Sequence, residues 1–98
     1  MKAFISGRVS GINYEYAKRN FKKVETVLVK QGYEVVNPTT LCNKEWSWLR
    51  CMCVCLWHLS KCDEIYVMRN YKKSKGAKIE LRFARLLRKQ VFFIDKKS

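Results

Sequence analysis

A chain of 98 residues is long enough for one domain and too short for two, so residues 1–98 are expected to form a single domain. Apolar residues make up 48% and charged residues 30% of the chain, a balance that excludes a disordered tail. The formal net charge of +13 suits a nucleic-acid partner, but the basic residues are spread along the whole chain, mostly at positions where helical spacing exposes them. Nucleic acid is therefore an alternative partner and not the favoured one.

In chain order, short apolar runs typical of strands alternate with segments whose apolar residues recur every three or four positions, as in helices. This pattern predicts a strand over 2–6, a helix over 13–31, a strand over 33–36, a loop over 39–43, a helix over 44–60, a strand over 64–68, a loop over 69–75, a helix over 76–89 and a strand over 91–94. Gly32 is the expected stop of the first helix, and Asn37-Pro38 closes the second strand. The last strand is continuously apolar, which is typical of a strand buried on both faces.

Alternating strands and helices predict right-handed crossovers and therefore a four-stranded parallel sheet of the α/β class, with helices on both faces. We expect the strand order 2-1-3-4. No apolar run approaches the ~20 residues that span a bilayer, and the first residues read as a strand and not as a signal peptide, so we expect a cytoplasmic protein without a membrane partner. Ligands of such sheets bind beyond the carboxyl ends of the strands, where residues 7–13 and 69–75 fall.

The first candidate ligand loop joins the first strand to the first helix and is rich in small residues. Its candidate binding residues are Ser6, Gly7, Arg8, Ser10 and Gly11. Small residues let a backbone approach an anion, and the free N–H groups of a helix start, together with an arginine, favour phosphate. A turn that merely needs two glycines explains the segment equally well, and the spacing does not match the dinucleotide-binding fingerprint.

The second candidate lies at the start of the third predicted helix. Ser74 and Gly76 stand where a helix N-terminus can hold a phosphate. Helical spacing puts Glu80 on one face with Ala77, Ala84 and Leu87, so its carboxylate points toward apolar surroundings, where it could act as a nucleophile or a base. The alternative is a glutamate at the edge of that face that pairs with one of the many arginines.

The five cysteines and the aromatic residues give weaker signals. Cys51, Cys55 and His58 share one helical face, a combination that can bind zinc, but no Cys-x-x-Cys pair exists and free cysteine is a common core residue, so we expect no metal and no cofactor. With an odd number of cysteines and no secretory signal, reduced thiols are expected rather than a disulfide framework. Trp48 is expected in the core, and Tyr71 is expected to line the ligand site.

Taken together in order, several short motifs resemble the nucleoside 2-deoxyribosyltransferase-like superfamily and, within it, the family of domain of unknown function 4406. The resemblance covers nearly the whole chain. It runs through Phe4-Ile5-Ser6-Gly7 with Gly11, Gly32-Tyr33-Glu34-Val35-Val36-Asn37-Pro38, Trp48, Met52, Leu59, Cys62-Asp63-Glu64-Ile65-Tyr66, Ser74, Gly76-Ala77, Glu80 and Ala84. It implies a flavodoxin-like three-layer fold, a nucleoside or nucleotide ligand, and a homo-oligomer in which a neighbouring subunit completes the active site.

The resemblance also implies roles for individual residues. A glutamate at the position of Glu80 attacks the anomeric carbon of a nucleoside, and the serine matching Ser74 binds phosphate together with the first loop. Relatives carry a second carboxylate eight residues before Asp63, and this count lands on Cys55. Asp63 itself falls at the start of the third strand, away from the ligand end, and is expected to be structural.

The leading interpretation is thus an N-glycosidase or 2-deoxyribosyltransferase-like protein with Glu80 as nucleophile. Because the second carboxylate is absent at Cys55, a non-catalytic module that binds or sequesters a nucleotide stays open as the alternative, and a basic nucleic-acid-binding protein is the third class.

Overall fold

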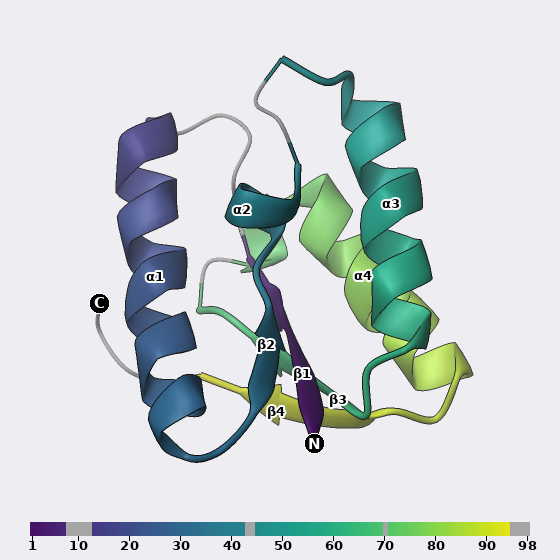
Figure 1. The fold of residues 1–98 in the computed structure, drawn as a ribbon. Helices are drawn as coiled ribbons and strands as arrows, with labels where there is room; N and C mark the ends of the chain where they lie inside the picture. Colours follow the sequence, from purple (N-terminus) through teal and green to yellow (C-terminus); the bar gives the residue numbers. More distant parts are fainter. Residues whose placement is uncertain (8–12, 43–44, 70, 95–98) are drawn as a thin grey trace.

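The fold alternates strands and helices along the chain, as the sequence predicts (Figure 1). The structure is a computed structural model that describes residues 1–7, 13–42, 45–69 and 71–94. Its elements are β1 (Lys2–Ser6), α1 (Tyr14–Lys30), β2 (Glu34–Val36), α2 (Pro38–Leu41), α3 (Trp48–Ser60), β3 (Glu64–Val67), a 3₁₀ turn (Tyr71–Lys73), α4 (Lys75–Leu86) and β4 (Gln90–Phe93).

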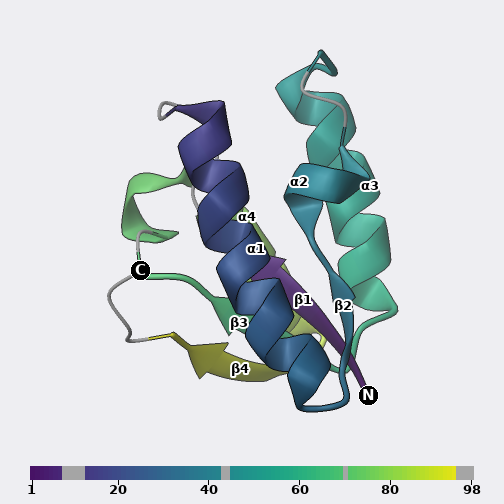
Figure 2. The same ribbon diagram turned by 60° about the vertical axis from the view of Figure 1, so that its left-hand side comes forward.

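The four strands form one parallel sheet in the order β2-β1-β3-β4, which confirms the predicted order and class. Phe4 of β1 is in register with Val36 of β2 on one side and with Ile65 of β3 on the other. Helix α1 covers one face of the sheet, and α3 and α4 cover the opposite face, so the molecule has three layers (Figures 1 and 2). None of the helices in the described part of the chain is both long and apolar enough to cross a bilayer.

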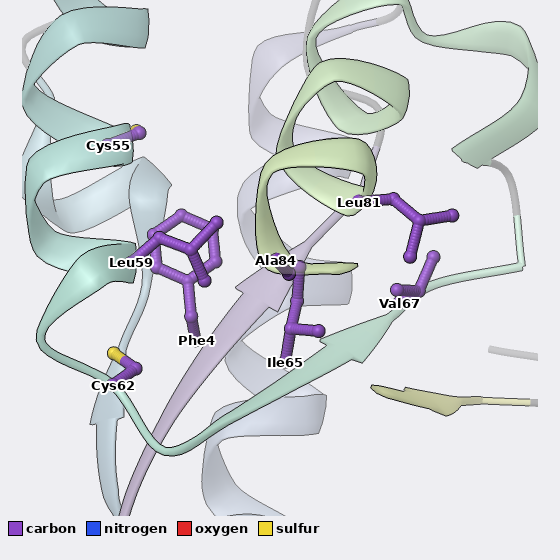
Figure 3. Close-up of a cluster of buried hydrophobic side chains, with 8 residues drawn as sticks. All are labelled: Phe4, Cys55, Leu59, Cys62, Ile65, Val67, Leu81 and Ala84. Atoms are coloured by element: carbon purple, nitrogen blue, oxygen red, sulfur yellow. The ribbon is translucent and has the colours of Figure 1, made fainter. Parts of the chain in front are cut away.

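Strand alternation divides the apolar side chains between two cores. On the α1 side, Ala3 and Ile5 of β1 pack with residues of α1. On the α3/α4 side, Phe4 belongs to a larger cluster (Figure 3). The buried members of that cluster are Phe4, Cys55, Leu59, Cys62, Ile65, Val67, Leu81 and Ala84. Since Ser6 is two residues beyond Phe4, the same alternation turns the Ser6 side chain toward the α3/α4 layer.

Short polar side chains start the three long helices at the carboxyl end of the sheet. The side chain of Asn13 accepts from the N–H of Tyr16, and Ser47 Oγ accepts from the N–H of Arg50. Ser74 Oγ accepts from the N–H of Ala77 in the same way. Each cap satisfies a backbone donor that a helix start leaves without a partner. The N-termini of all three helices therefore lie toward the carboxyl end of the sheet (Figure 1).

Two boundaries between residues 37 and 48 differ from the sequence prediction. The predicted loop over 39–43 contains the short helix α2, because Asn37 accepts from the N–H of Thr39 as its N-cap and Pro38 has the backbone angle of a first helical residue. The predicted helix over 44–60 begins only at Trp48, because Ser47 acts as its N-cap. The prediction counted an apolar periodicity and overlooked both caps.

The apolar run of the last strand predicted burial on both faces, but strand β4 is not buried in this way. It is the edge strand and pairs with β3 alone in the sheet. Phe92 and Phe93 are 40% and 50% exposed. Phe92 stacks on Tyr66 with a distance of 5.0 Å between ring centroids. An apolar run thus predicted the strand correctly but not its burial, which depends on its place in the sheet.

Candidate active site at the carboxyl ends of the strands

A buried hydrogen bond joins the two candidate ligand segments. Ser6, the last residue of β1, is fully buried, and Glu80 of α4 is 5% exposed. The Ser6 hydroxyl donates to Glu80 Oε1 over 2.6 Å, although 74 positions separate the two residues. The structure therefore brings together one residue from each predicted ligand segment, at the carboxyl end of the central strand.

The surroundings of Glu80 hold its carboxyl close to neutrality. Burial disfavours the charged form and raises the pKa from 4.5 to about 7, while the hydrogen bond from Ser6 opposes this shift. No described lysine or arginine forms an ion pair with Glu80, so arginine pairing does not compensate for its burial there. Near neutral pH, the carboxyl populates both the protonated form and the anion.

Helical spacing identified the buried face of α4 almost completely. Ala77 and Ala84 are buried beside Glu80, as predicted, and Leu81 is buried as well. Leu87 is 41% exposed, because α4 ends at Leu86 and the chain turns away. Its predicted place on the Glu80 face is wrong.

Cys55 of α3 lies within electrostatic range of Glu80. The thiol is 1% exposed. Burial, reinforced by the charge of Glu80, raises its pKa to about 12. Cys55 is therefore a neutral thiol at the position where the superfamily resemblance implies a second carboxylate, and it supplies no second anion to the site.

Gly7 is required by a close contact, independently of any ligand. A Cβ atom at this position would lie 2.7 Å from Met68 Sδ and 3.0 Å from Met68 Cβ. The N–H of Met68 donates to the Ser6 carbonyl over 2.7 Å, which holds the two chain segments together. The other candidates of the first loop, Arg8, Ser10 and Gly11, lie outside the described residues.

The N-terminus of α4 is flanked by two residues that the sequence interpretation did not assign to the site. Gly76 is buried, and a Cβ there would lie 3.1 Å from Met52 Sδ and 3.5 Å from Trp48 Nε1. Trp48 is 43% exposed, so its predicted core position is wrong. The Lys75 ammonium lies 5.4 Å from the centroid of the Trp48 ring. Recognising Ser47 as a helix cap would have placed Trp48 at this end of α3.

The remaining two candidates lie at opposite ends of the sheet. The half-buried Tyr71 has its ring 5.5 Å from that of Phe93, beside the edge strand, and its ligand role stays a prediction. Asp63 precedes β3 at the amino end, where its Oδ2 accepts from the backbone N–H of Lys2 over 3.0 Å. The structural role expected for Asp63 agrees with this contact.

The chain matches a protein family and is similar to a solved structure. The family model described as domain of unknown function (DUF4406) matches residues 1–93. The chain belongs to this family. Among solved structures, the CMP N-glycosidase BcmB from Clostridium botulinum is similar to the DUF4406 chain, with a TM-score of 0.68 and 20% sequence identity over 95% of this chain and 70% of that one. No curated protein matches the sequence. This similarity shows that the two chains share a fold.

The cysteines of this DUF4406 chain are arranged differently from the sequence prediction. Cys42 and Cys51 form a disulfide with a Cα–Cα distance of 5.7 Å, so the expectation that all five thiols are reduced is wrong. Cys53, Cys55 and Cys62 are free. The pair formed because Cys42 ends α2 next to the first turns of α3, a proximity that spacing along one helix does not reveal.

Proposed function

We propose that this DUF4406 protein is an N-glycosidase or 2-deoxyribosyltransferase-like enzyme that acts on a nucleoside or nucleotide, with Glu80 as its nucleophile. The observation that carries the proposal is the buried Glu80 carboxyl, which Ser6 orients and whose pKa lies at about 7. Buried acids with shifted pKa values concentrate at functional sites, because their burial costs stability. The fold shared with a CMP N-glycosidase supports the substrate class.

In the proposed reaction, a carboxylate oxygen of Glu80 bonds to the anomeric carbon of the sugar as the bond to the base breaks. The electron pair of that bond leaves with the base, which takes up a proton. Water, or a second base, then attacks the anomeric carbon, and the glutamate leaves as a carboxylate. A nearby anion stabilises the oxocarbenium-like transition state of both steps.

The N-terminus of α4 is the proposed anchor for a 5′-phosphate. Ser74 caps this helix, and Lys75 follows it. The helix N–H groups and dipole favour an anion there, and Lys75 adds a positive charge. Gly76, the second residue of the helix, is also proposed to bind the phosphate. The first loop, with Gly7, Arg8, Ser10 and Gly11, is proposed to hold the other side of the phosphate. Tyr71, and a second subunit of a homo-oligomer, are proposed to complete the site.

One observation favours a second function, a module of the same fold that binds a nucleotide without cleaving it. The thiol of Cys55 is neutral and cannot replace a carboxylate in positioning the sugar or protonating the leaving base. General acid–base assistance is worth ~10²–10⁴-fold in rate. A protein with this site can retain affinity for its ligand and lose turnover.

The two functions separate in an assay of base release. CMP, the other nucleoside monophosphates, and the corresponding nucleosides and deoxynucleosides are incubated with the protein, and free base is measured by chromatography. If the protein is an enzyme, we expect the wild type to release base and Glu80→Gln to release it about 10⁴-fold or more slowly. The matched control is Glu64→Gln, which removes a buried carboxyl at the other end of the sheet and is expected to retain activity.

Failure of the enzyme proposal has a clear signature. No base release from any member of the panel, combined with ligand-dependent thermal stabilisation, would establish the binding module instead. Release that persists unchanged in Glu80→Gln would remove Glu80 from the mechanism. If the panel shows no stabilisation and no base release, both functions are contradicted and the basic nucleic-acid-binding class is favoured. A steep fall of DNA or RNA affinity with salt would test that class.

A further inference from the structure

Three sulfur atoms converge between α2 and α3. Cys42 caps the C-terminus of α2, and Cys51 and Cys55 lie one turn apart on α3. The Sγ atom of Cys55 lies 3.7 Å from that of Cys42 and 3.8 Å from that of Cys51, and all three lie within 4.8 Å of one another. The sequence grouped Cys51 and Cys55 with His58, but His58 lies outside this cluster, with its ring beside that of Trp57.

We propose that Cys42, Cys51 and Cys55, in their reduced form, bind one thiophilic metal ion of the Zn²⁺ type. A metal–sulfur bond of about 2.3 Å in a tetrahedral site separates neighbouring sulfurs by about 3.8 Å. Both distances to Cys55 already have this value. The three thiolates leave one tetrahedral position for water or another ligand, as in open zinc sites.

The setting of the sulfurs favours a bound ion over a chance contact. Cys55 is buried in the core cluster, and Cys42 and Cys51 pack against it. Their segments, the end of α2 and the first turns of α3, would be joined by the ion in the same way as the disulfide joins them. Soft thiolate ligands select zinc or copper(I) over magnesium or calcium.

Metal binding requires the disulfide to open. A dithiol reductant transfers two electrons and two protons to the Cys42–Cys51 pair, gives two thiols and itself becomes a disulfide. The divalent ion then replaces the protons of three thiols, and three protons pass to the solvent. The disulfide and the metal complex are therefore alternative states of one site.

Cobalt(II) is a suitable probe, because its bonds to thiolates absorb light by charge transfer. We expect the full chain, reduced with a phosphine in the absence of air, to develop this absorption with one ion per chain and to release three protons per ion. Added Zn²⁺ should abolish the absorption by displacement. The oxidised protein should show none, because two of its three ligands are bonded to each other.

The variants locate the site. Cys42→Ser and Cys55→Ser should each lose the charge-transfer absorption at cobalt concentrations that saturate the wild type. Cys53→Ser, exposed on the same helix, and Cys62→Ser, buried with its thiol on the His58 carbonyl, should retain it. If circular dichroism shows that Cys55→Ser does not fold, the cobalt absorption of Cys42→Ser, at a half-buried position, becomes the deciding measurement. No absorption in the reduced wild type, or equal losses in the Cys53 and Cys42 variants, would overturn the proposal.

Discussion

Two buried glutamates lie near opposite ends of the sheet and differ in their partners. Glu80, at the carboxyl end, is 5% exposed and accepts from the Ser6 hydroxyl. Glu64 begins β3 at the amino end, is 4% exposed and accepts from the Tyr66 hydroxyl, which lies 3.1 Å from that of Tyr33. One carboxyl thus faces the α3/α4 core, whereas the other belongs to a small polar network on the α1 side.

The contrast separates a carboxyl within a polar network from one that is buried among apolar groups with Ser6 as its hydrogen-bond donor. The glutamate at the amino end accepts from the hydroxyl of Tyr66, whose ring also meets that of Tyr33 edge-on. The glutamate at the carboxyl end has a neutral thiol and alanine side chains around it, and its burial raises its pKa to about 7. A protein bears such a cost where a function requires it.

The largest expected effect is on the pH dependence of stability. Because the pKa of Glu80 is raised, the folded state keeps a proton that the unfolded state loses between pH 4.5 and about 7, so stability falls as pH rises through this window. The shift corresponds to about 3 kcal/mol. Glu80→Gln keeps the shape and stays neutral, so above pH 7 it should be more stable than the wild type by up to about 3 kcal/mol.

Urea denaturation at a series of pH values measures this difference. The matched control is Glu64→Gln, which we expect to show no gain at high pH, because the amide replaces a carboxylate that accepts from Tyr66. Equal stability of the wild type and Glu80→Gln across the whole range would contradict the idea that the buried carboxyl carries a penalty.

The next effect concerns the close packing beneath the first loop. Gly7→Ala would place a Cβ against the Cβ and sulfur of Met68, and overpacking of this kind costs about 1–3 kcal/mol. Gly32→Ala is the control, because a Cβ there meets no atom and only the positive φ of 92° opposes it, at about 1 kcal/mol. Chemical denaturation compares the two variants. If Gly7→Ala does not change the free energy of unfolding, contact with a ligand becomes the better explanation for a glycine at this position.

The sequence predicted the topology well because short apolar runs alternate with segments of helical periodicity. The apolar run in residues 2–6 and the recurrence of apolar residues in the helices predicted the four strands and their parallel order. It also placed Ser6 and Glu80 separately at the ligand end. Their direct hydrogen bond was not predicted, because it depends on which face of β1 meets α4, and only the packing of the layers decides that.

The failures concern features that periodicity does not contain: the place of a strand in the sheet, a helix cap, and a contact between two elements. Phe92 and Phe93 are exposed because β4 has a neighbour on one side only. Trp48 is exposed because α3 begins with it, after the Ser47 cap. Cys42 meets Cys51 because α2 follows β2 directly. Local periodicity contains none of this information.

A smaller effect is expected from the serine that donates a hydrogen bond to Glu80. The hydrogen bond from Ser6 lowers the pKa of Glu80, so Ser6→Ala should raise it further. Carbon-13 NMR of the labelled glutamate carboxyl measures the titration directly. Tyr66→Phe, which removes the hydroxyl beside Glu64, is the control and should leave the titration of Glu80 in place. An unchanged titration in Ser6→Ala would argue against the assigned hydrogen bond.

The smallest effect is expected at the amino end, where Asp63 binds the backbone of Lys2 near the surface. Asp63→Ala should cost less than about 1 kcal/mol, because water replaces the lost acceptor at an exposed position. The Glu80 titration and any base release should be unchanged. Urea denaturation and the same NMR titration test both statements in one variant. A shifted Glu80 titration would mean that the two ends are coupled through β1, and the division between a structural end and a proposed functional end would then fail.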